Sequence, residues 1–171
     1  SYYYTTDDSG PIGATYEART GLSEVLDTIK IKYGLSSELD GYLFVGDCSH
    51  DKIENASNLI FRSKPGMYSI FDYANDFATL KSKPTAFANF NGRLYTFDKS
   101  NIYRINPENL TVEDIYEGIG CYGKDSVVVT EQGMYFADKS GAYFHDGQKP
   151  LKISEPIQKG GKSEETFSGT D

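Results

Sequence analysis

The chain has 171 residues, with 17 Lys or Arg against 25 Asp or Glu, so its net charge is −8 and its isoelectric point is near 4.8. This acidic balance argues against phosphate-backbone binding as the main activity and predicts no sequence-specific nucleic-acid partner. No apolar run reaches the roughly 18 residues that a membrane span needs, and no signal peptide is recognisable. Fourteen Tyr, ten Phe and 17 Gly without any Trp indicate a β-rich chain with many tight turns.

Residues 1–47 are predicted to form a small β segment. Four short β-prone runs with polar or Gly-Pro turns between them lie at residues 2–6, 14–18, 28–33 and 42–45. Apolar residues at helical spacing after Thr20 leave a helix over 22–29 as an alternative. With strands preferred, this part is a small sheet or half-sandwich. Because the sequence begins at Ser1, we expect a processed product or a piece of a longer protein.

The polar stretch 47–58 is predicted to be a loop and the boundary to the next part of the chain. Residues of mixed metal-ligand type lie close together in it, namely Asp47, Cys48, His50 and Asp51. Hard and soft ligands at this spacing match no pattern of a metal site, so we expect a solvated loop. Cys48 and Cys121 are the only cysteines in the sequence, and we expect two buried free thiols.

An internal repeat organises the second half of the chain. Residues 94–106 align without a gap with residues 134–146, because both ends of the segment shift by 40. Residues 59–70 align with the beginning of the same segment when it is shifted by 35 residues toward the N-terminus. Repeats of about 40 residues that are built from short strands are typical of propellers and other stacked arrays.

Each copy of the repeat has the pattern of a β-hairpin, with a polar turn between two β-prone runs. The turns of the later copies are Asp98–Asn101 and Asp138–Gly141, where the opening Asp can accept hydrogen bonds from the backbone of its own turn. In the first copy, Ser63–Gly66, we predict a type II turn with Pro65 and Gly66 at its centre.

The Lys and the Tyr that recur around these turns have two explanations. We prefer the one in which the Lys keeps the hairpin tip soluble and the Tyr beside it packs on the sheet. The alternative is a ligand-contacting surface that the copies share. Its candidate contact residues are Lys64, Tyr68, Lys99, Tyr103, Lys139 and Tyr143.

These patterns predict an all-β fold in which antiparallel, four-stranded, propeller-like blades follow the N-terminal β segment. Residues 85–116 and 126–154 each hold four expected strands, whereas the unit from residue 59 needs residues 42–45 as an inner strand. We divide the chain into the β segment 1–47, about three blades at 48–158 and a flexible tail or linker at 159–171. The ring is then incomplete, since propellers typically carry 4 to 8 blades.

No constellation of catalytic residues is recognisable. The inner strands expected at 85–90 and 126–130 carry no carboxylate, which a glycosidase propeller would need. There is also no strained Gly-x-Ser-x-Gly elbow that would present a nucleophile. We therefore expect no enzyme activity, no catalytic or cofactor-binding residues, no cofactor and no structural metal.

Two parts of the sequence resemble one known family. Residues 2–10, Tyr-Tyr-Tyr-Thr-Thr-Asp-Asp-Ser-Gly, are similar to the opening of its fibronectin-like segment. The second part resembles the blade that members of this family share, and it comprises Gly123–Val129, Gly133–Gly147 and Leu151–Ile157. It has a Ser-Val-Val strand, a Gly-Met-Tyr hairpin, an Asp-Gly turn and an Ile-Ser ending. The family comprises the β-propeller structural proteins of tailed-phage virions, notably the podovirus tail nozzle proteins.

The resemblance implies a fibronectin-like β segment at 1–47 and a location in the virion tail. It implies a tail nozzle or a tail tube or hub protein, part of a DNA conduit or of a ring that holds adhesins. Other virion structural proteins would be its partners, and no active site is implied. An acidic lumen would repel the phosphates of passing DNA.

Two other functions remain open at this point. One is an extracellular or surface β-propeller module that binds glycans or proteins, with exposed aromatic residues such as Tyr122, Tyr135 and Tyr143. The other is an extracellular propeller enzyme, for which no perturbed acid or base can be named.

An array that stops at three blades leaves the apolar face of a terminal blade uncovered. The positions expected to line such faces are Tyr95, Phe97, Tyr103 and Ile105 in one blade and Tyr135, Tyr143 and Val127 or Val129 in the next. We therefore expect the chain to form a homo-oligomer or to belong to a larger polypeptide that supplies further blades.

Overall fold

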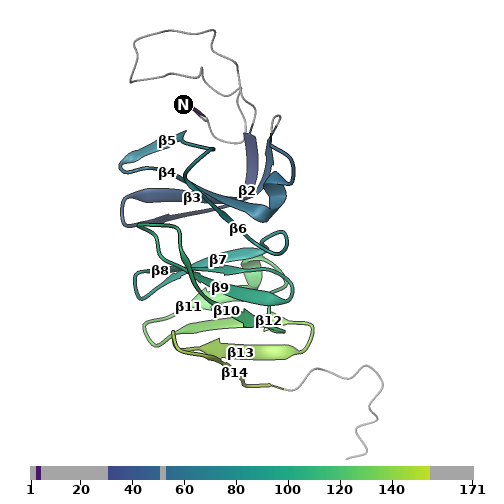
Figure 1. Ribbon diagram of the computed structural model, residues 1–171. Coiled ribbons are helices and arrows are strands. Elements are labelled where there is room, and N and C mark those ends of the chain that lie inside the picture. Colours follow the sequence, from purple (N-terminus) through teal and green to yellow (C-terminus); the bar gives the residue numbers. More distant parts are fainter. Residues whose placement is uncertain (1–2, 5–30, 51–52, 155–171) are drawn as a thin grey trace, which may run out of the picture.

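The computed structural model describes residues 31–50 and 53–154 together with the backbone of residues 3–4 (Figure 1). The strand predicted at 14–18, the alternative helix over 22–29 and the tail at 159–171 lie outside the described residues. So does Asp51 of the mixed-ligand stretch.

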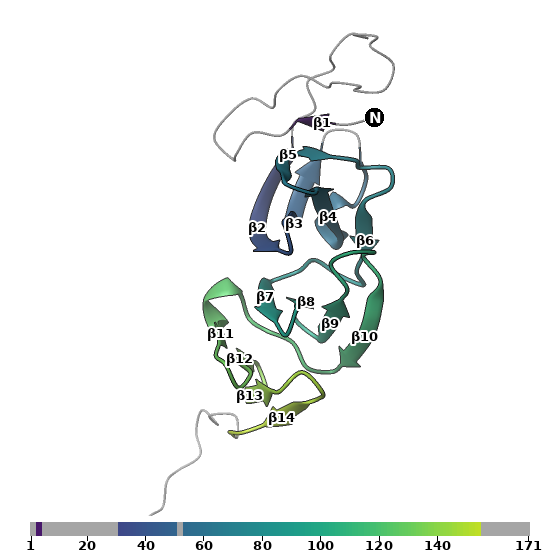
Figure 2. The same ribbon diagram turned by 90° about the vertical axis from the view of Figure 1, so that its left-hand side faces the viewer.

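The described part of the chain is all-β, and its strands form three antiparallel sheets that follow one another along the molecule (Figures 1 and 2). The other regular elements of these ranges are two 3₁₀ turns, η1 (Ala56–Asn58) and η2 (Lys124–Ser126). Accordingly, no helix in the described ranges is long and apolar enough to cross a membrane.

The first sheet has six strands in the order β1-β5-β4-β3-β2, and β6 pairs with β4 outside this path. The strands are β1 (Tyr3–Tyr4), β2 (Ile31–Leu39), β3 (Tyr42–His50), β4 (Leu59–Lys64), β5 (Met67–Phe71) and β6 (Phe77–Thr79). The predicted pairing of residues 42–45 with the strand from residue 59 is confirmed, because Val45 pairs with Phe61. At the turn between β4 and β5, Gly66 has a φ of 67°, as the predicted type II turn requires.

The loop predicted over residues 47–58 is wrong at its start, because β3 continues through His50 and pairs with β2. The polar residues of this stretch alternate with buried ones, and Cys48 is 3% exposed in the interior of the first sheet. β4, on the far side of the loop, pairs with β3. The predicted division of the chain near residue 47 therefore does not coincide with a break in hydrogen bonding.

The second and third sheets repeat one another. The second has the order β10-β9-β8-β7 and the third the order β11-β12-β13-β14. Their strands are β7 (Ala86–Phe90), β8 (Arg93–Phe97), β9 (Asn101–Ile105), β10 (Val112–Glu117), β11 (Val127–Val129), β12 (Met134–Asp138), β13 (Gly141–His145) and β14 (Pro150–Lys152). The second and third strands of each sheet are joined by turns at 98–101 and 138–141, as predicted.

The shift of 40 extends to the pairing register of the two sheets. Leu94 pairs with Ile105 in the second sheet, and Met134 pairs with His145 in the third. A shift of one residue would exchange the two faces of a strand, so equal registers place equivalent side chains on equivalent faces.

Three apolar clusters hold the sheets together. The cluster between the first and second sheets includes Phe44, Ile60, Leu94, Tyr103 and Ile105. The cluster between the second and third sheets includes Ala88, Tyr95, Phe97, Phe136 and Tyr143. The cluster inside the first sheet includes Val45, Phe61, Phe71 and Tyr73. Within residues 31–50 and 53–154, the second sheet is therefore covered on both faces and the third sheet on one.

Candidate functional site

The outer face of the third sheet carries a row of apolar side chains, one from each strand. Val128 pairs with Tyr135, Tyr135 with Phe144, and Phe144 with Leu151; we call these four residues the end face. Directly paired residues point to the same side of a sheet. Val128, Tyr135 and Leu151 are 60%, 43% and 46% exposed. A continuous exposed apolar surface of this kind is typical of an interaction site.

The equivalent row of the second sheet is covered. Its members Ala88, Tyr95 and Arg104 precede the end-face residues of the corresponding strands by 40 positions. Tyr95 is 1% exposed, and its hydroxyl donates to Gly147 O at 3.3 Å. Arg104 Nη1 donates to the same oxygen at 3.2 Å. The third sheet thus covers the face of the second sheet that corresponds to its own end face.

Most positions predicted to line faces between blades are buried between sheets. Those positions are Tyr95, Phe97, Tyr103, Ile105 and Tyr143. Val127 is partly buried against the second sheet, whereas Val129 is exposed. Tyr135 lies on the uncovered end face.

The six candidate contact residues do not form one surface. Tyr103 and Tyr143 are 1% and 6% exposed and belong to the clusters between sheets. Tyr68, at the same position of the repeat, is exposed and donates to Glu38 Oε1 at 2.6 Å. The recurring Tyr is therefore a packing residue in two copies.

The three repeated lysines also lie in different surroundings. Lys64 forms an ion pair with Asp76 at 2.7 Å, on the first sheet. Lys99 and Lys139 are exposed at the turns of the second and third sheets and line a common cavity.

The opening Asp of each repeated turn is an internal hydrogen-bond acceptor. Asp98 is 0% exposed, and its Oδ1 accepts from Ser100 N and Asn101 N at 2.7 Å each. Its Oδ2 accepts from the Tyr103 hydroxyl at 2.7 Å. Burial alone would raise the pKa of Asp98, but the hydrogen bonds from Asn101, Ser100 and Tyr103 outweigh it and hold the pKa below its ordinary value. The turn is thereby fixed to the strand that follows it.

The linker 118–123 joins the second sheet to the third and runs between their repeated turns. Cys121 N donates to Asp98 O at 2.9 Å, and Gly120 N donates to Asp138 Oδ2 at 3.2 Å. A Cβ at position 120 would lie 2.3 Å from Asp98 O, so this close passage requires glycine. The linker is therefore bonded to the turns on both of its sides.

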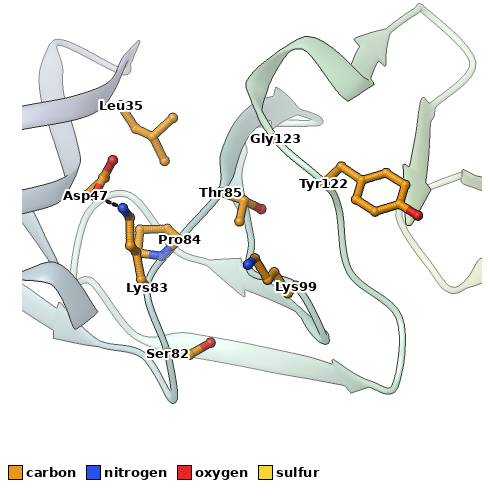
Figure 3. A pocket seen from close by; sticks show the side chains of 9 residues that line it. All are labelled: Leu35, Asp47, Ser82, Lys83, Pro84, Thr85, Lys99, Tyr122 and Gly123. Carbon is orange, nitrogen blue, oxygen red and sulfur yellow. Dashed lines mark ion pairs between the residues drawn. The ribbon is translucent and has the colours of Figure 1, made fainter. Parts of the chain in front are cut away.

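Two adjoining cavities flank this linker. The larger, of about 430 Å³, has walls from the first and second sheets that include Leu35, Asp47, Lys83, Thr85, Lys99 and Tyr122 (Figure 3). The smaller, of about 310 Å³, is lined by Lys99, Ser100, Cys121, Tyr122, Asp138 and Lys139. Because Lys99 and Tyr122 line both cavities, we treat the two as one groove, the linker groove.

The linker groove combines an exposed aromatic ring with lysines. Tyr122 is 61% exposed, which fits the aromatic surface predicted for a glycan-binding module. Lys83 Nζ lies 2.9 Å from Asp47 Oδ1, and the Lys99 side chain points into the larger cavity (Figure 3). Among the described residues, Lys99 and Lys139 form no ion pair. The groove therefore offers unpaired positive charge on an acidic chain.

A third cavity of about 430 Å³ lies on another part of the contact between the second and third sheets, with Arg93, Arg104 and Glu113 in its wall. Its charges compensate one another, because Glu113 Oε2 lies 2.9 Å from Arg93 Nε and 3.3 Å from Arg104 Nε. It offers less free charge to a ligand than the linker groove does.

His145 is fully buried in β13. Its ring lies edge-on to Tyr95 and Tyr116, at centroid distances of 5.2 and 4.8 Å. Nδ1 accepts from Gly147 N at 2.9 Å, which requires the neutral ring. Burial lowers the pKa of His145 below its ordinary value.

The described residues contain no group of three or more His, Cys, Asp or Glu that could hold a metal ion. Cys48 and Cys121 are buried free thiols, as predicted. Burial, with a contribution from the neighbouring Asp47, raises the pKa of Cys48 to about 12, so this thiol is a poor nucleophile and metal ligand.

No protein-family model matches the sequence, and no curated protein matches it.

The sequence pattern did not indicate that Lys99, Lys139 and Tyr122 line one groove. The one available signal was the repeat, because equivalent turns of stacked sheets come to lie side by side. No local pattern marked the linker as the segment between those turns.

Proposed function

We propose that this chain is a structural component of a tailed-phage virion, in which the second and third sheets act as consecutive blades of a propeller-like array. The array would form part of a tail nozzle or of a tail tube or hub that conducts DNA or holds adhesins. The sequence resemblance of residues 2–10 and 123–157 supports this proposal, and so does the repeated stacking of the sheets. The net charge of −8 suits a conduit that does not retain phosphates.

The end face is the observation that carries the proposal. Leu94 and Tyr103 of the second sheet face the first sheet, and their equivalents Met134 and Tyr143 face the second sheet. Each sheet thus turns the same face toward the sheet before it. One more sheet added by this rule would cover Tyr135 and the rest of the end face.

We propose a further four-stranded sheet of the same kind as the occupant of the end face. Covering an exposed large apolar side chain contributes about 1–2 kcal/mol, so a four-residue row offers several kcal/mol to assembly. The face of the second sheet that carries Leu94 is already buried by the first sheet. The corresponding face of the third sheet, which carries Met134, is already buried by the second sheet. Copies of the chain can therefore meet through this surface only end face to end face, unless a different polypeptide segment supplies the sheet.

Sedimentation of the purified chain at micromolar concentration tests the assembly. We expect self-association, because the uncovered end faces pair when no further sheet is present. The double variant Val128→Lys/Tyr135→Glu is expected to be monomeric with an unchanged circular dichroism spectrum. Met67→Glu is the matched control, because Met67 is 50% exposed on the first sheet, and it should associate like the original chain. A strictly monomeric original chain that binds no apolar dye would overturn the stacking proposal.

Antibodies against the chain test the virion part of the proposal. We expect label at the tail end of tailed particles from the source culture. Label that is absent from particles and confined to the free extracellular fraction would favour a binding module instead.

A further inference from the structure

We propose that the linker groove binds a saccharide that carries carboxylate groups, such as a uronate oligomer. This activity is independent of the proposed assembly, because the groove lies at the repeated turns and includes no end-face residue.

The groove is held in place before any ligand arrives. Tyr122 N donates to Ala137 O at 3.0 Å, and Cys121 N donates to Asp98 O at 2.9 Å. On the other side, Thr85 Oγ1 donates to Cys121 O at 2.8 Å. A backbone bonded to two sheets fixes the point from which the Tyr122 side chain projects, so little backbone entropy is lost when a ligand binds.

An exposed tyrosine ring on a fixed backbone is a platform for the apolar face of a sugar ring. Tyr122 is 61% exposed and lines both cavities, of about 430 Å³ and 310 Å³. Cavities of this size accommodate a small ligand or one residue of a longer chain. Hydroxyl groups of Ser82, Thr85 and Ser100 in the walls can hydrogen-bond a hydroxylated ligand.

The charge of the groove selects for an anion. Lys99 lines both cavities and Lys139 lines the smaller one, and within the described ranges neither is neutralised by an ion pair. Asp138 also lines the smaller cavity, where it is 6% exposed and accepts from Ser140 N at 2.7 Å and from Gly120 N at 3.2 Å, so the two lysines there still outnumber the one carboxylate. Two lysines and one exposed aromatic residue in the walls of one groove fit a saccharide with carboxylates along its chain.

A nucleic-acid strand fits the groove less well than a sugar acid. Single-strand binding needs a basic groove that follows successive phosphates and several aromatic platforms. The groove has a single exposed ring among its described residues, and the chain as a whole carries a net charge of −8. Long-range repulsion would therefore oppose a polyphosphate more than a short oligosaccharide.

Isothermal titration of the full chain with an oligogalacturonate tests this proposal. Separate titrations with neutral maltohexaose and with oligo-dT provide the comparison. We expect the oligogalacturonate to bind at least about tenfold more tightly than either. Lys99→Gln/Lys139→Gln should weaken binding about tenfold or more, and raised salt should weaken it further. Tyr122→Ala should also weaken binding about tenfold, through loss of the platform.

Lys149→Gln and Tyr135→Phe are the matched controls, because both residues are exposed and lie outside the groove. They should leave the affinity unchanged. Equal binding of maltohexaose, preference for oligo-dT, or no binding of any probe would each overturn the proposal. The end-face variant Val128→Lys/Tyr135→Glu should still bind, which separates this proposal from the assembly.

Discussion

Tyr95 and Tyr135 occupy the same position in the second and third sheets, 40 residues apart, and yet one is 1% exposed and the other 43%. Ala88 and Val128 differ in the same way, at 4% and 60%. The first three strands of the two sheets and their pairing register correspond, so the difference does not arise inside these strands. It arises because the second sheet has a neighbour on each face and the third has a neighbour on one.

The repeated turns show a second difference between the sheets. Asp98 Oδ2 accepts from the Tyr103 hydroxyl of its own sheet, whereas Asp138 Oδ2 accepts from Gly120 N of the linker. The Oδ1 of each Asp accepts from its own turn, but Oδ2 accepts from the following strand in one sheet and from the linker in the other. Equivalent positions of a repeat can thus take over different structural tasks.

The largest expected effect comes from removing the two equivalent tyrosines in turn. Tyr95→Ala should lower the free energy of unfolding by about 3–5 kcal/mol, because it leaves a cavity between two sheets. Tyr135→Ala should lower it by less than about 1 kcal/mol, since its ring is partly solvated in the monomer. Urea denaturation at a concentration where the chain is monomeric measures both. Equal losses would mean that the end face is covered within the single chain.

The connection between the sheets can be broken at the linker. Gly120→Ala should cost about 1–3 kcal/mol, because the added Cβ would lie 2.3 Å from Asp98 O and would push the turn away. Gly123→Ala is the matched control, since a Cβ there meets nothing within 4 Å and its φ of 177° is ordinary extended backbone. Thermal unfolding should show a lower midpoint for the first variant only. A neutral Gly120→Ala would contradict the close passage of the linker.

The smallest effect is a pH dependence near neutrality that the third sheet has and the second lacks, because His145 occupies the position of Ile105. Burial lowers the pKa of His145 in the folded chain, although the nearby Asp146 and Asp114 oppose this and Arg104 supports it. Below the ordinary pKa of about 6.5 the unfolded chain therefore binds a proton that the folded chain does not. Stability should be complete above that pH and should fall below it by at most about 1.4 kcal/mol per pH unit.

His145→Ile, which copies the second sheet, should flatten the stability profile between about pH 6.5 and 5. Urea midpoints measured at several pH values in this window provide the test. An equal slope in both proteins would show that His145 does not set it.

The repeat predicted the second and third sheets in detail. The turns at 98–101 and 138–141, the strands around them and the pairing of residues 42–45 with the strand from residue 59 all followed from it. Turn residues and alternation are local properties, because they depend on the backbone conformations that each residue favours and on a period of two. Such properties can be read from neighbouring residues alone.

The first sheet was predicted less well because its pairing depends on distant residues. β3 continues past polar Asp47 to His50, since β2 pairs with it on both sides of Asp47. β6 pairs with β4, which already pairs with β5 farther along the same strand, and no turn chemistry indicated this arrangement. Both features follow from which strands meet in space, and that choice is made by the assembled sheet.

The sequence by itself determined the all-β character, the hairpins and the equivalence of residues 40 apart, because these follow from composition, turn chemistry and period. The tertiary structure alone decided which equivalents are buried. Tyr103 and Tyr143 are buried, whereas Tyr68 at the same position of the repeat is exposed. Lys99 and Lys139 line one cavity beside the linker, which the residues of the two turns do not indicate. The physical reason is that burial and proximity depend on the neighbouring sheet, whose position is not written in the local pattern.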